Sequence, residues 1–390
     1  MERVGMEGSF ALSEAAKLAR SQVVAAYPIT PQTHIVERLA EMVANGELDA
    51  EYIPVESEHS AMSACLGSSA TGARTFTATS GQGLALMHEV LFVAASMRLP
   101  IIMAVSNRAL SAPLSIWGDH SDVMASRECG WLQLFAENGQ QAFDLTLCAF
   151  RIGEDPRVLF PVMVNVDGFN LSHVVEPLYL LDQATVDKFL PQYKHPYALH
   201  PDRPMTMGAF GMPYIYTEVK KSQDVALRAS RKVVLEVFDE YAKITGRKYS
   251  PVETYRTEDA EAVLLMMGSF SETASSAIDA LREAGQKVGL VTLRLWRPFP
   301  FEELSAALSK APLVIVLDRA LCLGGPTGPV CSEVQSALYA QAARPRVVSF
   351  VAGLGGRDVT VDAFKAIIAQ GVQKATQKYP GEFEMIGVRG

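Results

Sequence analysis

Three side chains in the first third of the sequence could together bind and activate a small carboxylic acid: Thr30, Glu58 and Arg108. Glu58 follows a short strand-like run, EYIPV, and open α/β sheets bind their ligands beyond the carboxyl ends of strands. Arg108 follows a continuous apolar run, and a guanidinium can grip a carboxylate through two parallel hydrogen bonds. Pro28 and Pro31 restrict the backbone around Thr30, so we expect it to be held extended.

Each of these residues also has a purely structural interpretation. Glutamate and serine at a helix start form a capping pattern, so Glu56 or Glu58 could serve only that role. The arginine could be a solvated cation on a surface loop. Asp119, His120 and Asp122 resemble ligands, but acidic residues are equally typical of the first turn of a helix, and the sequence favours that simpler reading.

Apolar strands alternating with amphipathic helices must position the candidate residues. Over the first half, strands are expected at 21–27, 51–55, 74–79, 99–105 and 158–166, and helices at 32–45, 58–71, 83–97 and 142–152. This alternation predicts a doubly wound parallel sheet in an α/β fold. The first domain should span 1–245, with an irregular extension from about 167.

The extension holds a stretch rich in Pro, Gly and Met at 195–213, whose role the sequence does not indicate, and a long helix over roughly 217–245. A polar segment at 246–260 reads as a linker. A second, smaller α/β domain is expected over 261–390. Its strands are predicted at 262–269, 288–293, 312–317 and 346–351, and its helices at 271–284, 301–310 and 328–341.

Composition excludes several classes of function. The 390 residues exceed what one hydrophobic core usually organises, which favours two domains. The 49% hydrophobic and 20% charged residues are typical of a folded globular protein. A net charge of −8 argues against nucleic acid and anionic membrane surfaces as partners. With no apolar run long enough to span a bilayer and no signal-peptide pattern, we expect a cytoplasmic protein.

The usual catalytic and metal-binding signatures are missing. Gly81-Gln82-Gly83 lacks the third glycine of a dinucleotide fingerprint, and Ser80 is not in a nucleophile elbow. None of the five cysteines forms a C-x-x-C pair, so we expect buried apolar cysteines in a reducing compartment and neither a zinc nor an iron–sulfur motif on this chain.

Several motifs nevertheless resemble a known family. They are YPITP (27–31), VESEHSA (55–61), RTFTATSGQGLALMHEVLF (74–92), NRALSAPLSIWGDHSD (107–122) and RPFP (297–300). Together they are similar to the α subunits of pyruvate:ferredoxin oxidoreductases, within the thiamine-diphosphate-dependent 2-oxoacid:ferredoxin oxidoreductases. The resemblance covers essentially the whole chain. It implies a first domain of the pyrimidine-binding thiamine type and a second domain like the C-terminal domain of transketolase.

The resemblance also assigns roles at matching positions. Glu58 matches the glutamate that hydrogen-bonds the aminopyrimidine of the cofactor and so favours the tautomer that acts as an internal base. Thr30 and Arg108 match residues that contact the 2-oxoacid. The cofactor-lining positions implied by the family motifs are Pro28, Ile29, Thr79, Ser80, Gly81, Gln82 and Gly83. No metal ligand is implied on this chain.

The implied reaction is 2-oxoacid + CoA + oxidised ferredoxin → acyl-CoA + CO₂ + reduced ferredoxin. The chain lacks the Gly-Asp-Gly motif through which thiamine enzymes hold the diphosphate and Mg²⁺. The resemblance therefore implies a β subunit carrying the diphosphate, Mg²⁺ and a [4Fe–4S] cluster, a γ subunit and a ferredoxin-like δ subunit. A branched-chain 2-oxoacid enzyme, a transketolase-like transferase and a non-catalytic assembly subunit are the alternatives.

Overall fold

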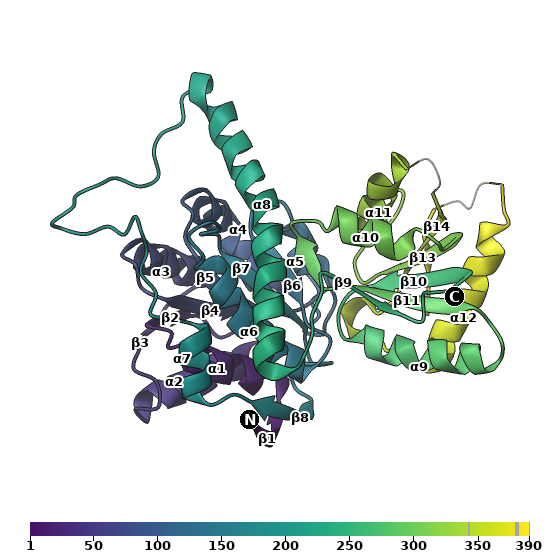
Figure 1. The fold of residues 1–390 in the computed structure, drawn as a ribbon, viewed down its shortest axis with the longest axis horizontal. Helices are drawn as coiled ribbons and strands as arrows, with labels where there is room; N and C mark the ends of the chain where they lie inside the picture. The colour runs from purple at the N-terminus through teal and green to yellow at the C-terminus, as the bar shows by residue number, and fades with distance from the viewer. Residues whose placement is uncertain (342–343, 379–381, 390) are drawn as a thin grey trace.

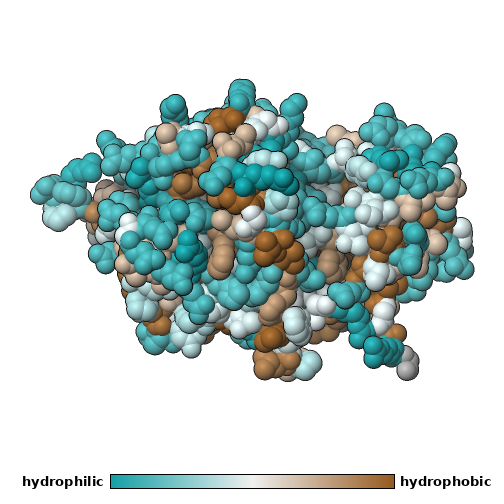
Figure 2. Space-filling model, turned by 90° about the horizontal axis from the view of Figure 1, so that it is seen from below, coloured by the Kyte–Doolittle hydropathy of each residue, from teal (hydrophilic) through white to brown (hydrophobic). Residues whose placement is uncertain are grey.

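The computed structural model describes residues 1–341, 344–378 and 382–389. Figure 1 shows two α/β lobes side by side, with the long helix α8 (Pro213–Thr245) standing along the first lobe near the junction. In the described residues, no helix is both long enough and apolar enough to cross a membrane. The lower face is mostly hydrophilic and carries small, separate hydrophobic patches (Figure 2).

The first lobe is built on a seven-stranded sheet of order β12-β6-β7-β5-β4-β2-β3. Its neighbouring strands run parallel, except that β12 is antiparallel to β6. The strands are β2 (Val23–Ala26), β3 (Glu51–Pro54), β4 (Thr75–Thr79), β5 (Ile101–Asn107), β6 (Leu132–Phe135), β7 (Val162–Asp167) and β12 (Leu295–Arg297). This confirms the predicted doubly wound sheet.

Helices cover both faces of this sheet. Strand β5 explains why: its seven residues are all buried, with Ile102 and Ala104 in one apolar cluster and Ile101, Met103 and Val105 in another. Successive side chains of a strand point to opposite faces, so both faces need cover. The first cluster includes residues of α1, α2, α6 and α8, and the second those of α3 and α4.

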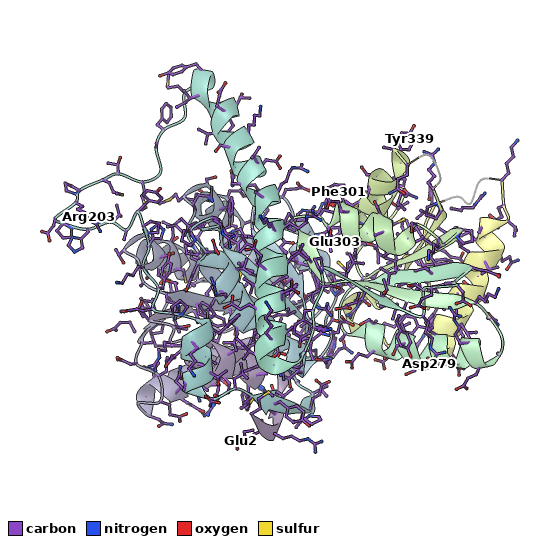
Figure 3. The ribbon with its side chains drawn as sticks, viewed as in Figure 1. Glu2, Arg203, Asp279, Phe301, Glu303 and Tyr339 are labelled. Atoms are coloured by element: carbon purple, nitrogen blue, oxygen red, sulfur yellow. The ribbon has the colours of Figure 1, made fainter. Side chains whose placement is uncertain are left out.

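The helices of the first lobe other than α8 are α1 (Gly8–Leu18), α2 (Thr33–Ala44), α3 (Glu58–Ala70), α4 (Gly81–Ser96), α5 (Ser121–Ala125), α6 (Gly139–Gly153) and α7 (Gln183–Phe189). A two-stranded antiparallel ribbon pairs β1 (Glu2–Glu7) with β8 (Val175–Leu180). The segment between α7 and α8, which contains 195–213, stands out from the body, and Arg203 marks its outer part (Figure 3).

The second lobe contains a six-stranded sheet of order β15-β14-β13-β10-β11-β9. The strands are β9 (Val252–Tyr255), β10 (Ala262–Met266), β11 (Val288–Leu293), β13 (Leu313–Asp318), β14 (Arg346–Val351) and β15 (Glu384–Met385). The helices are α9 (Phe270–Glu283), α10 (Phe301–Leu308), α11 (Pro329–Tyr339) and α12 (Val361–Ala375), with a short 3₁₀ turn, η1, at Leu354–Gly356.

Apolar and ionic contacts hold the two lobes together. One apolar cluster runs from Val105 of β5 to Val263 of β10. Arg231 of α8 donates to the Glu303 carboxylate of α10 at 2.7 Å, and Figure 3 labels Glu303 at this junction. Trp296 of β12, which belongs to the first sheet, is fully buried in the same apolar cluster. The lobes therefore share a core.

The structure differs from the sequence prediction at a few elements. The segment 246–260, predicted as a linker, contains β9, which pairs antiparallel with β11 at the edge of the second sheet. The short strand β12 leaves the second lobe and pairs with β6 of the first. The ribbon β1–β8, the strands β6 and β15 and the helices α1 and α12 were not predicted either. Strand β6 has only four residues, all buried, and most of α1 is buried, so neither shows a clear period. Helix α12, in contrast, buries Phe364, Ile367, Ile368 and Gly371 at helical spacing and could have been predicted.

Candidate active site

The candidate residues lie at one edge of the first sheet. Strands β5, β4, β2 and β3 are consecutive neighbours and run parallel, so their carboxyl ends share that edge. Arg108 directly follows β5, Ser80 follows β4, Thr30 stands in the loop after β2, and Glu58 begins the helix after β3. The structure therefore brings together residues that are up to 78 positions apart in sequence.

Glu58 is the first residue of α3 and is 6% exposed. It does not cap the helix: Ser57 is the N-cap, and its hydroxyl accepts from the Ser60 backbone N–H at 3.2 Å. Glu56 is engaged separately, accepting from the Ser60 hydroxyl at 2.6 Å. Within the described ranges, no residue donates a hydrogen bond to the Glu58 carboxylate. A buried acid without a donor is available to a ligand.

Gly83 makes room for this carboxylate. A Cβ atom at position 83 would lie 2.8 Å from Glu58 Oε1 and 2.4 Å from Thr79 Oγ1, closer than real Cβ contacts come. Gly81 plays a similar part beneath Arg108, because its Cβ would lie 3.0 Å from the arginine Cδ, and its φ of +48° also favours glycine. The two glycines of the predicted cofactor turn therefore allow the acid and the guanidinium to approach the backbone.

Arg108 is 7% exposed and is fixed by backbone carbonyls. Its Nε donates to Ser115 O at 2.9 Å and its Nη1 donates to Thr30 O at 3.0 Å. Burial lowers the pKa of Arg108, while the nearby carboxylates of Asp122 and Glu58 act in the opposite direction. The guanidinium still has N–H groups left to meet an anion. The interpretation of Arg108 as a solvated loop cation is therefore wrong.

Thr30 presents an exposed side chain beside this guanidinium. Its peptide bond to Pro31 is cis, and its carbonyl faces Arg108. Pro28 is exposed and Ile29 is half-buried in the same loop. Gln32 anchors the loop from below, since its buried side-chain Nε2 donates to the carbonyls of Tyr27 and Ala78 at 3.0 and 2.8 Å. The exposed Thr30 therefore lies directly beside the fixed guanidinium of Arg108.

The predicted cofactor turn carries polar atoms that have no partner. Thr79 Oγ1, Ser80 Oγ and Gln82 Oε1 are buried and make no hydrogen bond with the described residues. The neighbouring strand β5 contributes two more such atoms, Ser106 Oγ and Asn107 Oδ1. Buried polar atoms are normally satisfied, so unpaired atoms gathered at one strand edge fit a polar ligand. These residues, with the donor-free Glu58, fit a nitrogen-rich ring such as an aminopyrimidine.

The buried carboxylate of Asp122 links the cofactor turn to the residue after β5. Its Oδ2 accepts from the backbone N–H groups of Gly81 and Arg108, both at 2.9 Å. Its Oδ1 accepts from Val123 N at 2.7 Å and from Asn107 Nδ2 at 3.1 Å. Burial raises the pKa of Asp122 to about 7, although these hydrogen bonds act in the opposite direction. The predicted position in a first helical turn is confirmed, but one carboxylate also ties the cofactor turn to the arginine.

Asp119, His120 and Asp167 connect the lobes instead, and the backbone N–H of His120 donates to the Arg319 carbonyl at 2.8 Å. His120 Nε2 pairs with Asp167 Oδ1 at 2.8 Å, and the same oxygen meets Arg319 Nη1 at 2.5 Å. Asp167 Oδ2 accepts from Ser269 N and Oγ, each at 2.7 Å. Burial alone would raise the pKa of Asp167, but Arg319 and His120 hold it well below its usual range. Asp119 Oδ2 accepts from the backbone of the second lobe at 3.1 Å.

Comparison with known proteins identifies the family. A family model described as pyruvate flavodoxin/ferredoxin oxidoreductase, thiamine diphosphate-binding, matches residues 14–239, and one described as pyruvate:ferredoxin oxidoreductase core domain II matches residues 260–364. The chain belongs to this oxidoreductase family. Its first domain is therefore of the thiamine-diphosphate-binding type, in agreement with the sequence analysis.

Curated relatives of this oxidoreductase chain match it nearly end to end. Pyruvate synthase subunit PorA of Pyrococcus abyssi is 47% identical, covering 99% of this chain and 98% of the relative. The PorA subunit of Methanocaldococcus jannaschii is 50% identical, covering 94% of each. Ketoisovalerate oxidoreductase subunit VorA of Pyrococcus horikoshii is 46% identical, covering 95% and 94%.

Two solved structures share the fold of this family member. A 2-oxoglutarate:ferredoxin oxidoreductase from Magnetococcus marinus superimposes with a TM-score of 0.71 at 20% identity. The match covers 96% of this chain and 65% of that chain. A split-gene transketolase matches with a TM-score of 0.56 at 12% identity, over 95% and 99% of the two chains. The expected transketolase-like plan is thus confirmed at the level of the fold.

Sequence reasoning missed some residues that hold the oxidoreductase site together. Asp122 was read as a helix-start acid, although its position close after Arg108 could have suggested a link between the two. Asp167 and Arg319 give no local signal, because their partners lie 47 or more positions away. The Ser115 carbonyl could not be assigned from sequence, since backbone acceptors depend on the path of the loop.

Proposed function

We propose that this chain is the α subunit of a multi-subunit pyruvate:ferredoxin oxidoreductase. The complex converts pyruvate, CoA and oxidised ferredoxin to acetyl-CoA, CO₂ and reduced ferredoxin, or runs the reverse synthesis. Near-full-length identity to pyruvate synthase subunits of 47–50% supports the substrate class. The observation that carries the proposal is the buried pair of charges: Glu58 has no donor, and Arg108 is aimed at Thr30 beside it.

Arg108 and Thr30 bind the substrate anion in this proposal. The guanidinium is held at Nε and Nη1, so its orientation is fixed before the substrate arrives. Its remaining N–H groups receive the pyruvate carboxylate, and the exposed Thr30 hydroxyl meets the same anion. Fixing these donors in advance lowers the entropy cost of orienting a three-carbon acid.

Glu58 holds the cofactor in the proposal. Its carboxylate, together with Pro28, Ile29 and the turn from Thr79 to Gly83, contacts the aminopyrimidine of thiamine diphosphate. When bound, the cofactor supplies the nucleophilic carbon and the electron sink that decarboxylation requires. The role of Glu58 is to hold a proton at the pyrimidine ring. The absence of a side chain at Gly83 lets the carboxylate pack against the backbone of the turn.

Partner subunits complete the site. A β subunit supplies the diphosphate-binding residues, Mg²⁺ and a [4Fe–4S] cluster, and γ and ferredoxin-like δ subunits complete a cytoplasmic complex. The cysteines support this division of labour: burial raises the pKa of Cys65, Cys129 and Cys331 to about 12, so these thiols are protonated and poorly suited to bind a cluster. Exposed apolar side chains at the rim, Leu114 and Trp117, offer a surface for the β subunit.

One other substrate remains a candidate for a specific reason, whereas an observation disfavours the remaining alternative. A branched-chain 2-oxoacid, such as 2-oxoisovalerate, is the second candidate substrate because the ketoisovalerate relative is 46% identical. The geometry of Thr30, Glu58 and Arg108 would serve that acid equally well. A non-catalytic assembly subunit is the third candidate, and the buried, donor-free Glu58 argues against it.

Anaerobic purification of the native complex through a tag on this chain tests the proposal. The eluate is assayed for CoA-dependent viologen reduction with pyruvate and, separately, with 2-oxoisovalerate. We expect a multi-subunit, iron-containing eluate with higher kcat/KM for pyruvate. A preference for the branched acid would change the substrate and keep the mechanism. An inactive single chain, recovered without partners under gentle conditions, would contradict the proposed function.

A further inference from the structure

A histidine pair and a glutamate lie together on the side of the first lobe where β1 meets α2. Glu7 ends β1, His34 lies in the first turn of α2, and His173 stands in the turn between β7 and β8. One potential ligand atom from each side chain lies within 4.8 Å of the other two. In the part of the chain that the structure describes, this is the one such group of His, Cys, Asp or Glu side chains.

The contacts within the group are short. His34 Nδ1 lies 2.7 Å from Glu7 Oε1. The imidazole rings of His34 and His173 have centroids 4.4 Å apart and an interplanar angle of 32°. Other histidine–carboxylate pairs, such as His200 with Asp202 at 3.7 Å, have no second histidine beside them. Two imidazoles and one carboxylate are a ligand set that suits divalent transition metals.

The surroundings fix the ring of His173. Its Nδ1 lies 2.8 Å from Ser172 Oγ, so a proton on Nδ1 leaves the Nε2 lone pair free. Ser172 is itself anchored, because its carbonyl accepts from both the backbone and the hydroxyl of Ser9, at 2.9 and 2.7 Å. The Phe169 ring also packs against His173, with the ring centroids 4.7 Å apart. Histidine ligands of metals characteristically have such a second hydrogen-bonded partner.

We propose that Glu7, His34 and His173 bind one zinc-type divalent ion. Ligand atoms at tetrahedral zinc stand roughly 3.4 Å apart, given bonds of about 2.1 Å. His34 Nδ1 and Glu7 Oε1 are 2.7 Å apart, and the three potential ligand atoms all lie within 4.8 Å of one another, so small side-chain rotations bring them to this spacing. The His34 side chain is 41% exposed and His173 is half-buried, which leaves room for these rotations and for a water as fourth ligand.

The ion would tie three parts of the first lobe together. It joins the N-terminal ribbon to the start of α2, three residues after the cis peptide that precedes Pro31. It also joins both to the turn after β7, where a Cβ on Gly168 would lie 2.7 Å from Pro31 Cγ. The site therefore stabilises the loop that carries Thr30, without touching the proposed substrate. It is separate from the Mg²⁺ proposed for the partner, and the sequence analysis expected no metal on this chain.

Zinc binding by the full-length chain tests this inference. After treatment with a chelator, the chain is titrated with Zn²⁺ by calorimetry, and the zinc-loaded chain is studied by X-ray absorption spectroscopy. We expect one saturable site per chain, imidazole nitrogen and carboxylate oxygen neighbours with no sulfur, and a higher melting temperature with zinc. Binding below one equivalent, or a coordination shell without two imidazoles, overturns the inference.

Substitutions locate the ion. His34→Gln and His173→Gln should each weaken Zn²⁺ binding by at least about tenfold. The control His200→Gln removes a histidine that faces a carboxylate outside the proposed site. This variant should bind zinc as tightly as the wild type does. Equal affinity in wild type and both site variants refutes the site. Melting temperatures measured in the presence of chelator identify a variant that fails to fold. If a variant does fail to fold, the X-ray absorption spectrum of the wild type shows whether two imidazoles bind the ion. None of these measurements depends on turnover. The zinc site can therefore be tested even if the proposed function is wrong.

Discussion

The substitution Gly83→Ala probes how tightly the acid is held. A methyl group at this position would lie 2.8 Å from Glu58 Oε1 and 2.4 Å from Thr79 Oγ1, whereas ordinary contacts begin at 3.4 Å. Glu58 Cγ would also lie 2.8 Å away, so the Glu58 side chain from Cγ outward and the Thr79 side chain must both shift. Relieving these contacts moves the Glu58 carboxylate by about 0.6 Å or more and rotates the threonine hydroxyl.

The expected effect on function is larger than the effect on stability. Alanine in place of a helical glycine gains about 1 kcal/mol of helix propensity, and overpacking costs about 1–3 kcal/mol. The free energy of unfolding should therefore fall by no more than about 2 kcal/mol. A misplacement of about 1 Å in a catalytic constellation can cost about 100-fold in rate. We expect kcat/KM for pyruvate to fall about 10- to 100-fold in the complex.

Gly67→Ala provides a matched control. Gly67 lies in α3, is exposed, and a Cβ there meets nothing within 4 Å. This variant should have unchanged turnover and a slightly higher melting temperature. The assay is CoA-dependent viologen reduction with pyruvate, accompanied by the affinity for thiamine diphosphate. If Gly83→Ala and Gly67→Ala have equal kcat/KM, the close packing of Glu58 against position 83 is not important for catalysis.

Three further substitutions test the contacts around this site. Arg108→Lys loses the bonds to the carbonyls of Ser115 and Thr30, so KM for pyruvate should rise about 10- to 100-fold, and an unchanged KM would contradict the substrate role. Asp122→Asn should flatten the pH dependence of stability: the pKa of Asp122 is raised to about 7, so the wild type loses stability as pH rises from about 4 to 7, which urea unfolding midpoints measure. Equal slopes in the two proteins would exclude that titration. Arg319→Met leaves Asp167 charged, buried and short of its strongest partner, and should cost about 3–5 kcal/mol of unfolding free energy near pH 7. Because the pKa of Asp167 is depressed, this loss should shrink as pH falls below about 4, and a pH-independent loss would contradict the ion-pair explanation.

The parts of the fold that could be predicted are those with strong local periodicity. Strands β11 and β14 begin and end where their apolar runs do, and the placement of Glu58 and Arg108 followed from the strand ends. Strand β12 could not be predicted in this way: the chain crosses from one sheet to the other through Arg294, which is buried between Glu137 and Glu253. Such a crossing depends on distant partners, and periodicity does not report them.

The same limit applies to the site. The two glycines of the turn look alike in sequence, yet only the structure shows that Gly83 faces the acid and Gly81 faces the arginine. The Asp122 carboxylate accepts hydrogen bonds from the backbone N–H groups of Gly81 and Arg108, and these two groups come together only in the folded sheet. The glutamate and the two histidines of the proposed zinc site are separated by 27 or more positions, so their spacing carries no motif.

Replacing Glu58 by glutamine in the purified complex shows whether this carboxylate takes part in turnover. Glutamine keeps the size of the side chain and removes its charge, so the partners should still assemble. We expect a loss of about 10²- to 10⁴-fold in pyruvate-dependent kcat, and no effect of the control Glu89→Gln, whose side chain is 86% exposed. Turnover within twofold of the wild type in Glu58→Gln would show that this carboxylate is not the working acid and would favour an assembly role for the chain.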